Sequence, residues 1–412
     1  MMAVWSVLAI LSLMDLQLAN RLYVSTAIYD HSVRIPFVEA VARTGVPPLN
    51  PFYGLGKIPV LRYYYYWYVV CALPEHLAGL SACSCFAASV IWSGFSLAAL
   101  IPLYLKYFFK ETVALRRKSL ICISLLLVTG LDLIPCTLKF LTTHLVEADM
   151  EWWDPNQVTS WLDSLIWVPH HVAALTACMA GFLVLSAQTD KAELRDRVWA
   201  GIIAGLAFAS AAGLSVYVAF VFLVFAAVWS VILAVKKRIR EFFTFMAAAG
   251  VSLLVSVPYL LDLHTQSKVG QRFAIFAIRD IPLVVRWLRH WGVQNPVLLD
   301  LSKLPVMVLL YAVELGFFFC VAILQFKRDL LRGTTLAQER LAAWVMLATT
   351  LLVVSLLQSD ASGNNDLGFR GMLLAQFILL LWAAPLVHDL FAKENSKEAN
   401  PGPVWKTILV LT

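Results

Sequence analysis

Residues 198–235 read VWAGIIAGLAFASAAGLSVYVAFVFLVFAAVWSVILAV and contain no charged side chain. A helix crosses the hydrocarbon core of a bilayer with about 20 apolar residues, so this stretch is too long for one crossing. Gly213 and Ser215 lie near its middle and mark the expected break. Because lipid offers no hydrogen bonds, each half must satisfy its own backbone groups as a helix. The stretch therefore predicts two consecutive membrane-spanning helices.

Composition extends this prediction to the whole chain. Of its 412 residues, 60% are hydrophobic and 14% are charged, whereas soluble domains are roughly 45–50% apolar and about 25% charged. We predict an all-α fold, a polytopic membrane helix bundle of about ten transmembrane helices that forms one domain over residues 1–412. The bilayer is its expected partner. The formal charge of +6 lies in short clusters between apolar blocks, a pattern typical of membrane topology and not of nucleic-acid binding.

The basic clusters orient the predicted helices, because Lys and Arg gather in the cytoplasmic loops of membrane proteins. These clusters are 106–118, 191–197, 236–240 and 327–340. With all of them inside, the predicted helices cover 2–17, 82–105, 119–139, 169–188, both halves of 198–235, 241–262, 304–325, 341–357 and 372–388. The outer face then receives 18–81, 141–168, 263–303 and 358–371.

Residues 63–79 are apolar enough to cross the membrane, but a crossing there would place the 106–118 cluster outside. The segment begins with four tyrosines and Trp67, and these side chains favour the headgroup level of a bilayer. We therefore predict that 31–44 and 63–79 are two interfacial helices within the first outer loop, 18–81.

The chain ends and the cysteines add further expectations. The first 14 residues lack a basic region and a small-residue cleavage site, which favours a signal anchor or first helix over a signal peptide. The run 404–412 reads as the start of another span, as expected of a fragment. Seven cysteines lie mostly within or beside apolar helices and include no CxxC pair, so we predict inert thiols. We expect no cofactor, with a divalent metal left as an open alternative.

Three polar clusters fall on the predicted outer face, which we expect to be the active, non-cytoplasmic face of a multi-pass inner or plasma membrane protein. The first joins Asp30 and His31 to the tyrosine run that includes Tyr64 and Tyr65. A loop aspartate is most often a solvated charge, and interfacial tyrosines are more often membrane anchors than ligand contacts. The neighbouring histidine can hydrogen-bond the acid, and the aromatic platform suits stacking on a sugar or lipid headgroup, so both favour a functional role for Asp30 instead.

The second cluster is His170 and His171, directly after Pro169. Proline fixes the start of a helix. Adjacent helical residues point about 100° apart, so the pair is poorly placed for one metal ion. Hydrogen bonding to a phosphate or sugar hydroxyl is easier to arrange, and polar anchoring at the interface is the plain alternative.

The third cluster is Asp366 and Arg370, between the last two predicted helices. The preceding Gly363 and Asn364 suit an ordinary turn. A guanidinium at the mouth of a span is costly without an anionic partner, and it can grip a phosphate with two hydrogen bonds. We therefore predict that Arg370 binds an anion and that Asp366 orients it.

Two acids fall inside predicted spans, Asp132 and Glu314, and buried acids in membranes are functional candidates. Asp132 precedes Pro135 near the outer end of its span, and Glu314 lies near mid-depth. The motifs of nucleotide-driven transport, hydride transfer and zinc proteases are absent from the sequence.

The first outer loop resembles that of the GT-C superfamily, polytopic glycosyltransferases that use polyprenyl-phosphate-linked sugars. The matching residues are Tyr29-Asp30-His31, the stretch RTGVPPLNPF at 43–52, and Tyr63–Tyr66. The order of a first helix, an acidic outer loop, two surface helices and a long bundle is similar as well. The sequence WVPH at 167–170 and NDLGFR at 365–370 look like further outer-face motifs of such proteins.

The resemblance implies a cell-envelope transferase that moves a sugar from a lipid-phosphate-linked donor to an acceptor. Asp30, with His31 beside it, would be the general base. The donor's phosphate and sugar would be bound by His170, His171, Asp366, Arg370, Tyr64 and Tyr65. Two departures from better-known members are the lack of a second acid directly beside Asp30 and of a soluble domain after the bundle.

Two other classes stay open. One is a transporter or flippase for a lipid-linked or anionic solute, and the other is a non-catalytic membrane protein of the same fold. Transporters commonly contain paired broken helices in two related halves, with polar groups near mid-membrane. The sequence has no convincing internal repeat, and its polar clusters lie on one predicted face, which favours the enzyme.

Overall fold

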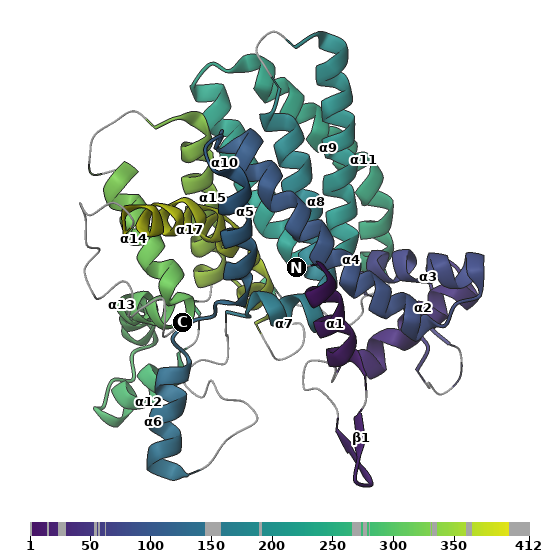
Figure 1. Ribbon diagram of the computed structural model, residues 1–412, viewed down its shortest axis with the longest axis horizontal. Coiled ribbons are helices and arrows are strands. Elements are labelled where there is room, and N and C mark those ends of the chain that lie inside the picture. The colour runs from purple at the N-terminus through teal and green to yellow at the C-terminus, as the bar shows by residue number, and fades with distance from the viewer. Residues whose placement is uncertain are drawn as a thin grey trace. The chain divides into compact units, whose positions relative to one another are not determined.

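The computed structural model describes residues 2–14, 16–23, 30–52, 56, 58–61, 63–144, 158–188, 192–265, 273–274, 278–279, 281–329, 331, 336–359 and 365–394. Helices make up most of this part of the chain, so the predicted all-α class is confirmed (Figure 1). Tyr29, Gly363, Asn364 and the run 404–412, which entered the predictions above, lie outside the described residues.

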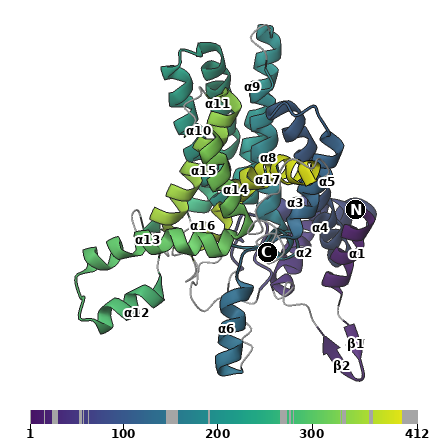
Figure 2. The same ribbon diagram turned by 60° about the vertical axis from the view of Figure 1, so that its left-hand side comes forward.

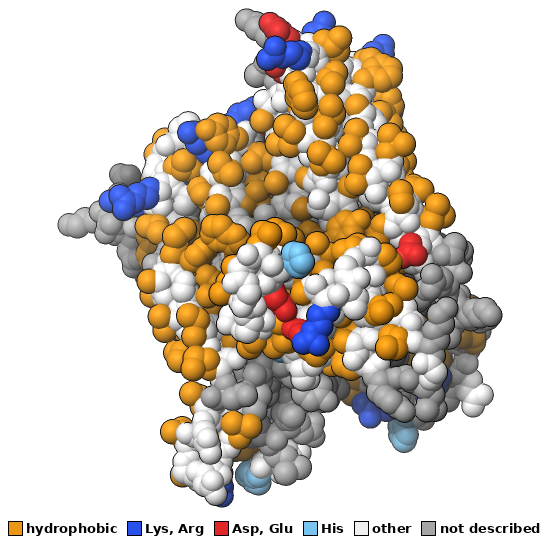
Figure 3. Space-filling model, turned by 90° about the vertical axis from the view of Figure 1, so that its right-hand side faces the viewer, with side chains coloured by type: hydrophobic (Ala, Val, Ile, Leu, Met, Phe, Trp, Pro, Cys, Tyr) orange, Lys and Arg blue, Asp and Glu red, His pale blue; other side chains and the backbone are white. Residues whose placement is uncertain are grey.

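Within the described residues, 8 helices are long and apolar enough to cross a membrane, which makes the chain a multi-pass integral membrane protein. They are α4 (Ala82–Leu103) with the π-helical segment Tyr104–Phe108 that continues it, α8 (Pro169–Ser186), α9 (Leu194–Leu214), α10 (Val216–Val235), α11 (Ile239–Thr265), α13 (Pro296–Leu315), α15 (Gln338–Leu356), and α16 (Asp366–Gly371) continued by α17 (Leu373–Glu394). Figure 3 shows a face on which hydrophobic side chains form a wide surface and charged groups are few, as lipid contact requires.

The break between α9 and α10 lies where the sequence predicts it. Ser215 is extended, and its Oγ accepts a hydrogen bond of 3.2 Å from the backbone N–H of Val218 in the first turn of α10. A serine oxygen at this position replaces a bond that the helix itself cannot make. This hydrogen bond stabilises the break between the two helices in its apolar surroundings.

Two predicted spans, 119–139 and 304–325, are wrong as continuous helices, and of the ten predicted spans 119–139 and 2–17 have no counterpart among the 8 candidates. Residues 119–139 divide into α5 (Leu115–Ser124), a 3-10 turn (Leu125–Leu127) and α6 (Leu133–Thr143). The N–H of Leu131, inside the break, donates to the carbonyl of Val313 at 2.7 Å. A Cβ on Gly130 would lie 2.3 Å from the carbonyl oxygen of Glu314, so glycine permits this approach.

The predicted helix over 304–325 is likewise interrupted. α13 ends at Leu315, Gly316 has a φ of 48°, and α14 (Phe317–Asp329) begins directly afterwards. Glycine adopts a positive φ without the steric cost that other residues pay. The first predicted helix is also shorter than expected, because α1 (Met2–Leu13) is followed by a small antiparallel hairpin, β1 (Leu16–Leu18) with β2 (Arg21–Tyr23).

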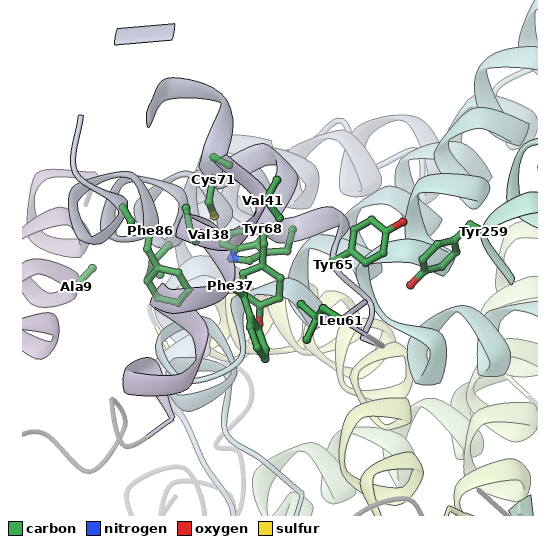
Figure 4. Packing of buried hydrophobic residues seen from close by; sticks show 14 residues of the cluster. Ala9, Phe37, Val38, Val41, Leu61, Tyr65, Tyr68, Cys71, Phe86 and Tyr259 are labelled. Atoms are coloured by element: carbon green, nitrogen blue, oxygen red, sulfur yellow. The ribbon is translucent and has the colours of Figure 1, made fainter. Parts of the chain in front are cut away.

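The chain forms two compact units, with the first comprising residues 1–103, 162–220 and 230–268. In this unit α8, α9 and α11 pack together, and the two predicted surface helices are present as α2 (His31–Thr44) and α3 (Tyr66–Ala78). A helix of 13 residues such as α3 is roughly 20 Å long, too short to cross the bilayer core of about 30 Å. Phe37, Tyr68 and Phe86 belong to the core that joins α2, α3 and α4 (Figure 4).

Within the first unit, the surface helices and the basic turns lie at opposite ends of the spans. Tyr66 of α3 lies against Gly213, at the end of α9, and close to Tyr259, near the end of α11. The basic residues 236–240 lie at the other end of α11, at its start. This polarity is the one that the predicted topology requires, with the tyrosine run away from the basic turns.

The second unit comprises residues 104–161, 221–229 and 269–412. Its central helix is α17, which is apolar on all sides and packs against α5, α14 and α15 (Figure 2). α12 (Pro282–His290) packs against α13, and α7 (Trp161–Ile166) begins in this unit. A short pair of strands, β3 (Phe273–Ala274) with β4 (Gln358–Ser359), precedes α16.

Candidate functional site

Asp30 is the residue before α2, and its carboxylate is held by two donors from the first unit. Oδ2 accepts a hydrogen bond of 2.9 Å from Arg34 Nη2 and one of 2.8 Å from Trp167 Nε1. Among the described residues, no donor reaches Oδ1. The side chain of Asp30 is 37% exposed. The carboxylate is therefore fixed through one oxygen while the other is available to a ligand.

Arg34 lies one helical turn after Asp30, and its side chain is only 7% exposed. Its Nη1 is buried and has no hydrogen-bond partner among the residues that the structure describes. Burial of an arginine is costly without anionic partners, and Asp30 supplies one of them. Arg34 thus keeps a second donor unused, directly beside the candidate base.

His31 is buried at the first position of α2. Its Nε2–H donates to the carbonyl of Ile166 at 3.1 Å, and the ring meets Phe86 edge-on, with centroids 4.8 Å apart. Burial, followed by the nearby positive charge of Arg34, lowers the pKa of His31 to about 4. The imidazole is neutral at physiological pH and ties α2 to the segment that carries Trp167.

The tyrosine run forms a layer over the start of α8. Tyr63 and Tyr64 are stacked with centroids 4.0 Å apart, and their hydroxyls are joined by a 3.0 Å hydrogen bond. The ring of Tyr64 lies 5.2 Å from that of His170 and 5.6 Å from that of His171. Burial raises the pKa of the Tyr64 hydroxyl well above its ordinary value, so Tyr64 remains a neutral donor.

His170 and His171 are both buried, and their ring centroids are 4.1 Å apart in spite of the different directions in which the two residues leave the helix. His171 Nδ1 lies 2.7 Å from the hydroxyl oxygen of Ser215, the residue that caps α10. The pair therefore connects the aromatic layer to the break between α9 and α10. No set of three or more potential metal-ligating side chains occurs among the described residues.

Tyr65 is separated from this group. Its ring meets Tyr259 of α11 at a right angle, with centroids 5.3 Å apart, and it is buried in the core of the first unit. Tyr64 and Tyr65 were both predicted to contact a sugar or phosphate. The structure brings Tyr64 close to the histidine pair, whereas Tyr65 packs between helices.

Arg370 and Asp366 belong to the second unit, where both lie on the short helix α16. Arg370 is buried, and its Nη1 donates to Thr159 Oγ1 at 3.2 Å. The neighbouring backbone N–H of Val158 donates to Glu314 Oε2 at 3.0 Å. Residues 158–159 therefore bring Glu314 close to the environment of Arg370, a relation that sequence spacing does not reveal. The pairing of Asp30 with Arg370 stays a prediction, since the two residues belong to different units.

Two features of the first unit were not predicted from the sequence. One is Arg34 as a partner of Asp30, and the other is the indole of Trp167 as the second donor to Asp30. A signal for Arg34 was present, because residues four apart lie on the same helix face and Asp30 precedes it by four. The indole of Trp167 was noted as part of the WVPH stretch, but nothing in the sequence connected it with Asp30, 137 positions earlier.

Comparisons with known proteins assign no activity to this arrangement. No protein-family model matches the chain, and no solved structure matches it. The uncharacterized protein y4nK of Sinorhizobium fredii is 26% identical over 268 residues, which are 61% of this chain and 38% of that protein. The chain thus spans well under two thirds of the length of this relative, whose name states no activity.

Proposed function

We propose that the chain is a membrane glycosyltransferase that moves a sugar from a lipid-phosphate-linked donor to an acceptor hydroxyl, with Asp30 as general base. The observation that carries this proposal is the geometry of Asp30. Trp167 and Arg34 hold Oδ2, and Oδ1 receives no bond from the described residues. A general base needs this combination of fixed orientation and an accessible oxygen.

The reaction would be an inverting displacement. The acceptor oxygen attacks the anomeric carbon, its proton passes to Asp30 Oδ1, and the bond from that carbon to the phosphate oxygen breaks. The lipid phosphate leaves with the bonding electrons and needs a cation or hydrogen-bond donors to stabilise the charge. Tyr64 with His170 is proposed to contact the donor, and the assignment of Arg370 to the phosphate stays a prediction from the sequence.

Two further observations support an enzyme over a transporter. The polar group of the first unit lies at the ends of α8, α9 and α11, beside short surface helices, whereas transporters bind solutes near mid-membrane. The carboxylate is also held by two donors, an arrangement suited to a fixed reacting group.

The test uses membranes that contain the full chain, supplied with a polyprenyl phosphate carrying a radiolabelled sugar. Transfer is measured as loss of label from the lipid fraction, together with release of polyprenyl phosphate. Asp30→Asn keeps the size of the side chain and should lower transfer by about 10²–10⁴-fold. Asp329→Asn, which changes a buried acid of the second unit, is the matched control and should retain transfer per folded molecule.

Three outcomes would contradict the proposal. The first is label that crosses a sealed vesicle still attached to its lipid, which would indicate a flippase. The second is undiminished transfer by Asp30→Asn, which would remove the proposed base. The third is the absence of transfer from each of several polyprenyl-linked hexoses and pentoses, with the donor recovered intact.

A further inference from the structure

The helix α12 has two chemically different sides. Its sequence is PLVVRWLRH, and a helix turns by about 100° per residue. Leu283, Trp287 and Leu288 fall on one side, while Arg286 and Arg289 fall on the opposite side. The helix is therefore amphipathic, with its basic groups segregated from its apolar ones.

No residue of α12 is buried, which is unusual for a helix of this composition. The side chains of Trp287 and Trp291 are 61% and 71% exposed, and their ring centroids lie 6.1 Å apart. Leu283 is 45% exposed. Exposing a tryptophan and leucine surface to water is unfavourable by roughly 25 cal/mol for each Å² of apolar area. The apolar side of α12 therefore requires an environment that removes it from water.

The neighbouring helix α13, against which α12 packs in the second unit, also carries exposed apolar residues (Figure 2). Exposed Val297, Leu301, Leu304 and Val308 recur along one side of α13 at helical spacing. The opposite side of α13 holds buried Leu310. In a multi-pass membrane protein, a stripe of this kind on a long apolar helix contacts lipid.

We propose that α12 lies in the membrane interface, with Trp287 and Trp291 at the boundary of the acyl chains and with Arg286 and Arg289 on the phosphates of anionic lipids. Nine residues span roughly 14 Å, so α12 is too short to cross the bilayer. Tryptophan concentrates at that boundary, and each basic residue near an anionic surface contributes about a fivefold increase in binding. This role is independent of any transfer chemistry.

The first test measures the environment around α12 in the full chain, reconstituted into vesicles of phosphatidylcholine and phosphatidylglycerol. Cys83, Cys136 and Cys320, the cysteines that are not buried, are replaced by serine. A nitroxide is then placed at position 284 or 288 on the apolar side, or at 286 or 289 on the basic side. Collision rates with oxygen report lipid, and those with a water-soluble nickel complex report water.

Labels at 284 and 288 should favour oxygen, and those at 286 and 289 should favour nickel. Equal nickel access on both sides would place α12 in water and overturn the proposal. Protection of 284 and 288 from both reagents would also overturn it, because the apolar side would then be covered by protein.

The second test addresses the charge. In the protein labelled at 288, adding phosphatidylglycerol to phosphatidylcholine vesicles should raise the ratio of oxygen to nickel collisions. The double variant Arg286→Gln/Arg289→Gln should lose this lipid dependence. The control Arg116→Gln/Arg117→Gln, with exposed basic residues on α5, should keep it. If the α12 double variant responds to anionic lipid as the parent does, α12 does not bind anionic headgroups.

Discussion

Asp30 and Asp329 are two carboxylates with similar partners and different surroundings. Each is bound by an arginine and by the indole N–H of a tryptophan. At Asp329, in the second unit, Arg340 Nη1 reaches Oδ1 at 3.1 Å, Trp344 Nε1 reaches Oδ2 at 3.2 Å, and Gln325 adds a bond of 2.7 Å to Oδ2. At Asp30 both donors bind the same oxygen.

Exposure separates the two sites further. The side chain of Asp329 is 0% exposed, and that of Asp30 is 37% exposed. A buried carboxylate with bonds to both oxygens has little capacity for a ligand and serves to join α14 to α15. The carboxylate with one oxygen held and partial exposure retains capacity for chemistry. The number of donors on each oxygen, and not the kind of partner, distinguishes a structural aspartate from a candidate catalytic one.

The largest expected difference is in stability. Asp329→Asn turns an amide donor toward a buried donor, because both oxygens of Asp329 accept hydrogen bonds, and it should lower the free energy of unfolding by about 2–4 kcal/mol. Asp30→Asn keeps one oxygen that accepts from both Arg34 and Trp167, so it should cost less, about 1 kcal/mol. Equilibrium unfolding in mixed detergent micelles measures both. Similar losses for the two variants would show that both aspartates have the same structural role.

A second test measures how the stability of the protein depends on pH through His31, the neighbour of Asp30. The pKa of His31 falls from 6.5 in the unfolded chain to about 4 in the folded one, so the unfolded state binds more protons between these values. Stability should be unaffected by this residue above pH 7 and should fall by about 2 kcal/mol between pH 7 and pH 5. His31→Gln keeps a donor for the Ile166 carbonyl and should remove this portion of the acid sensitivity. A His31→Gln profile parallel to the parent from pH 7 to pH 5 would show that His31 is not the group responsible.

The smallest expected effects come from the two indoles. Trp167→Phe removes one of the donors that orient Asp30 and should lower the rate of sugar transfer about fivefold, equivalent to about 1 kcal/mol. Trp344→Phe should leave the transfer rate unchanged and lower the free energy of unfolding by about 1 kcal/mol. The two variants thus change different quantities. A Trp344→Phe protein that is fully stable but slow in transfer would reverse the assignment.

Much of the fold follows from the sequence because membrane helices obey strong local rules. Long apolar runs located most of the spans, and Gly213 with Ser215 marked the break between α9 and α10. The helix predicted over 31–44 is present with those bounds. The prediction of a continuous helix over 119–139 was wrong because the break depends on α13, where the carbonyl of Val313 accepts a hydrogen bond from the N–H of Leu131. No local pattern encodes a partner so distant in the chain.

The candidate site was less accessible from the sequence for the same reason. Residue type and position near a predicted boundary were sufficient to select Asp30 and the histidine pair. Arg34 was overlooked because an arginine inside a surface helix reads as a solvated charge, whereas here α3 and α4 pack against its helix and its side chain is almost completely buried. The hydrogen bond from Trp167 Nε1 to Asp30 is a tertiary contact, which composition and spacing do not predict.

The position of α17 has a consequence for biogenesis. This helix follows α5, α14 and α15 in the chain, yet all three pack against it, and most of its residues from Leu373 onward are buried. During synthesis the earlier helices of the second unit therefore enter the membrane before the helix that fills the space between them. Their inner faces must be covered by lipid or by the insertion machinery until α17 emerges. Ribosome-associated intermediates that end before Leu373 should consequently be more sensitive to proteases and to quality control. This sensitivity should be lost once α17 has been synthesised and packed.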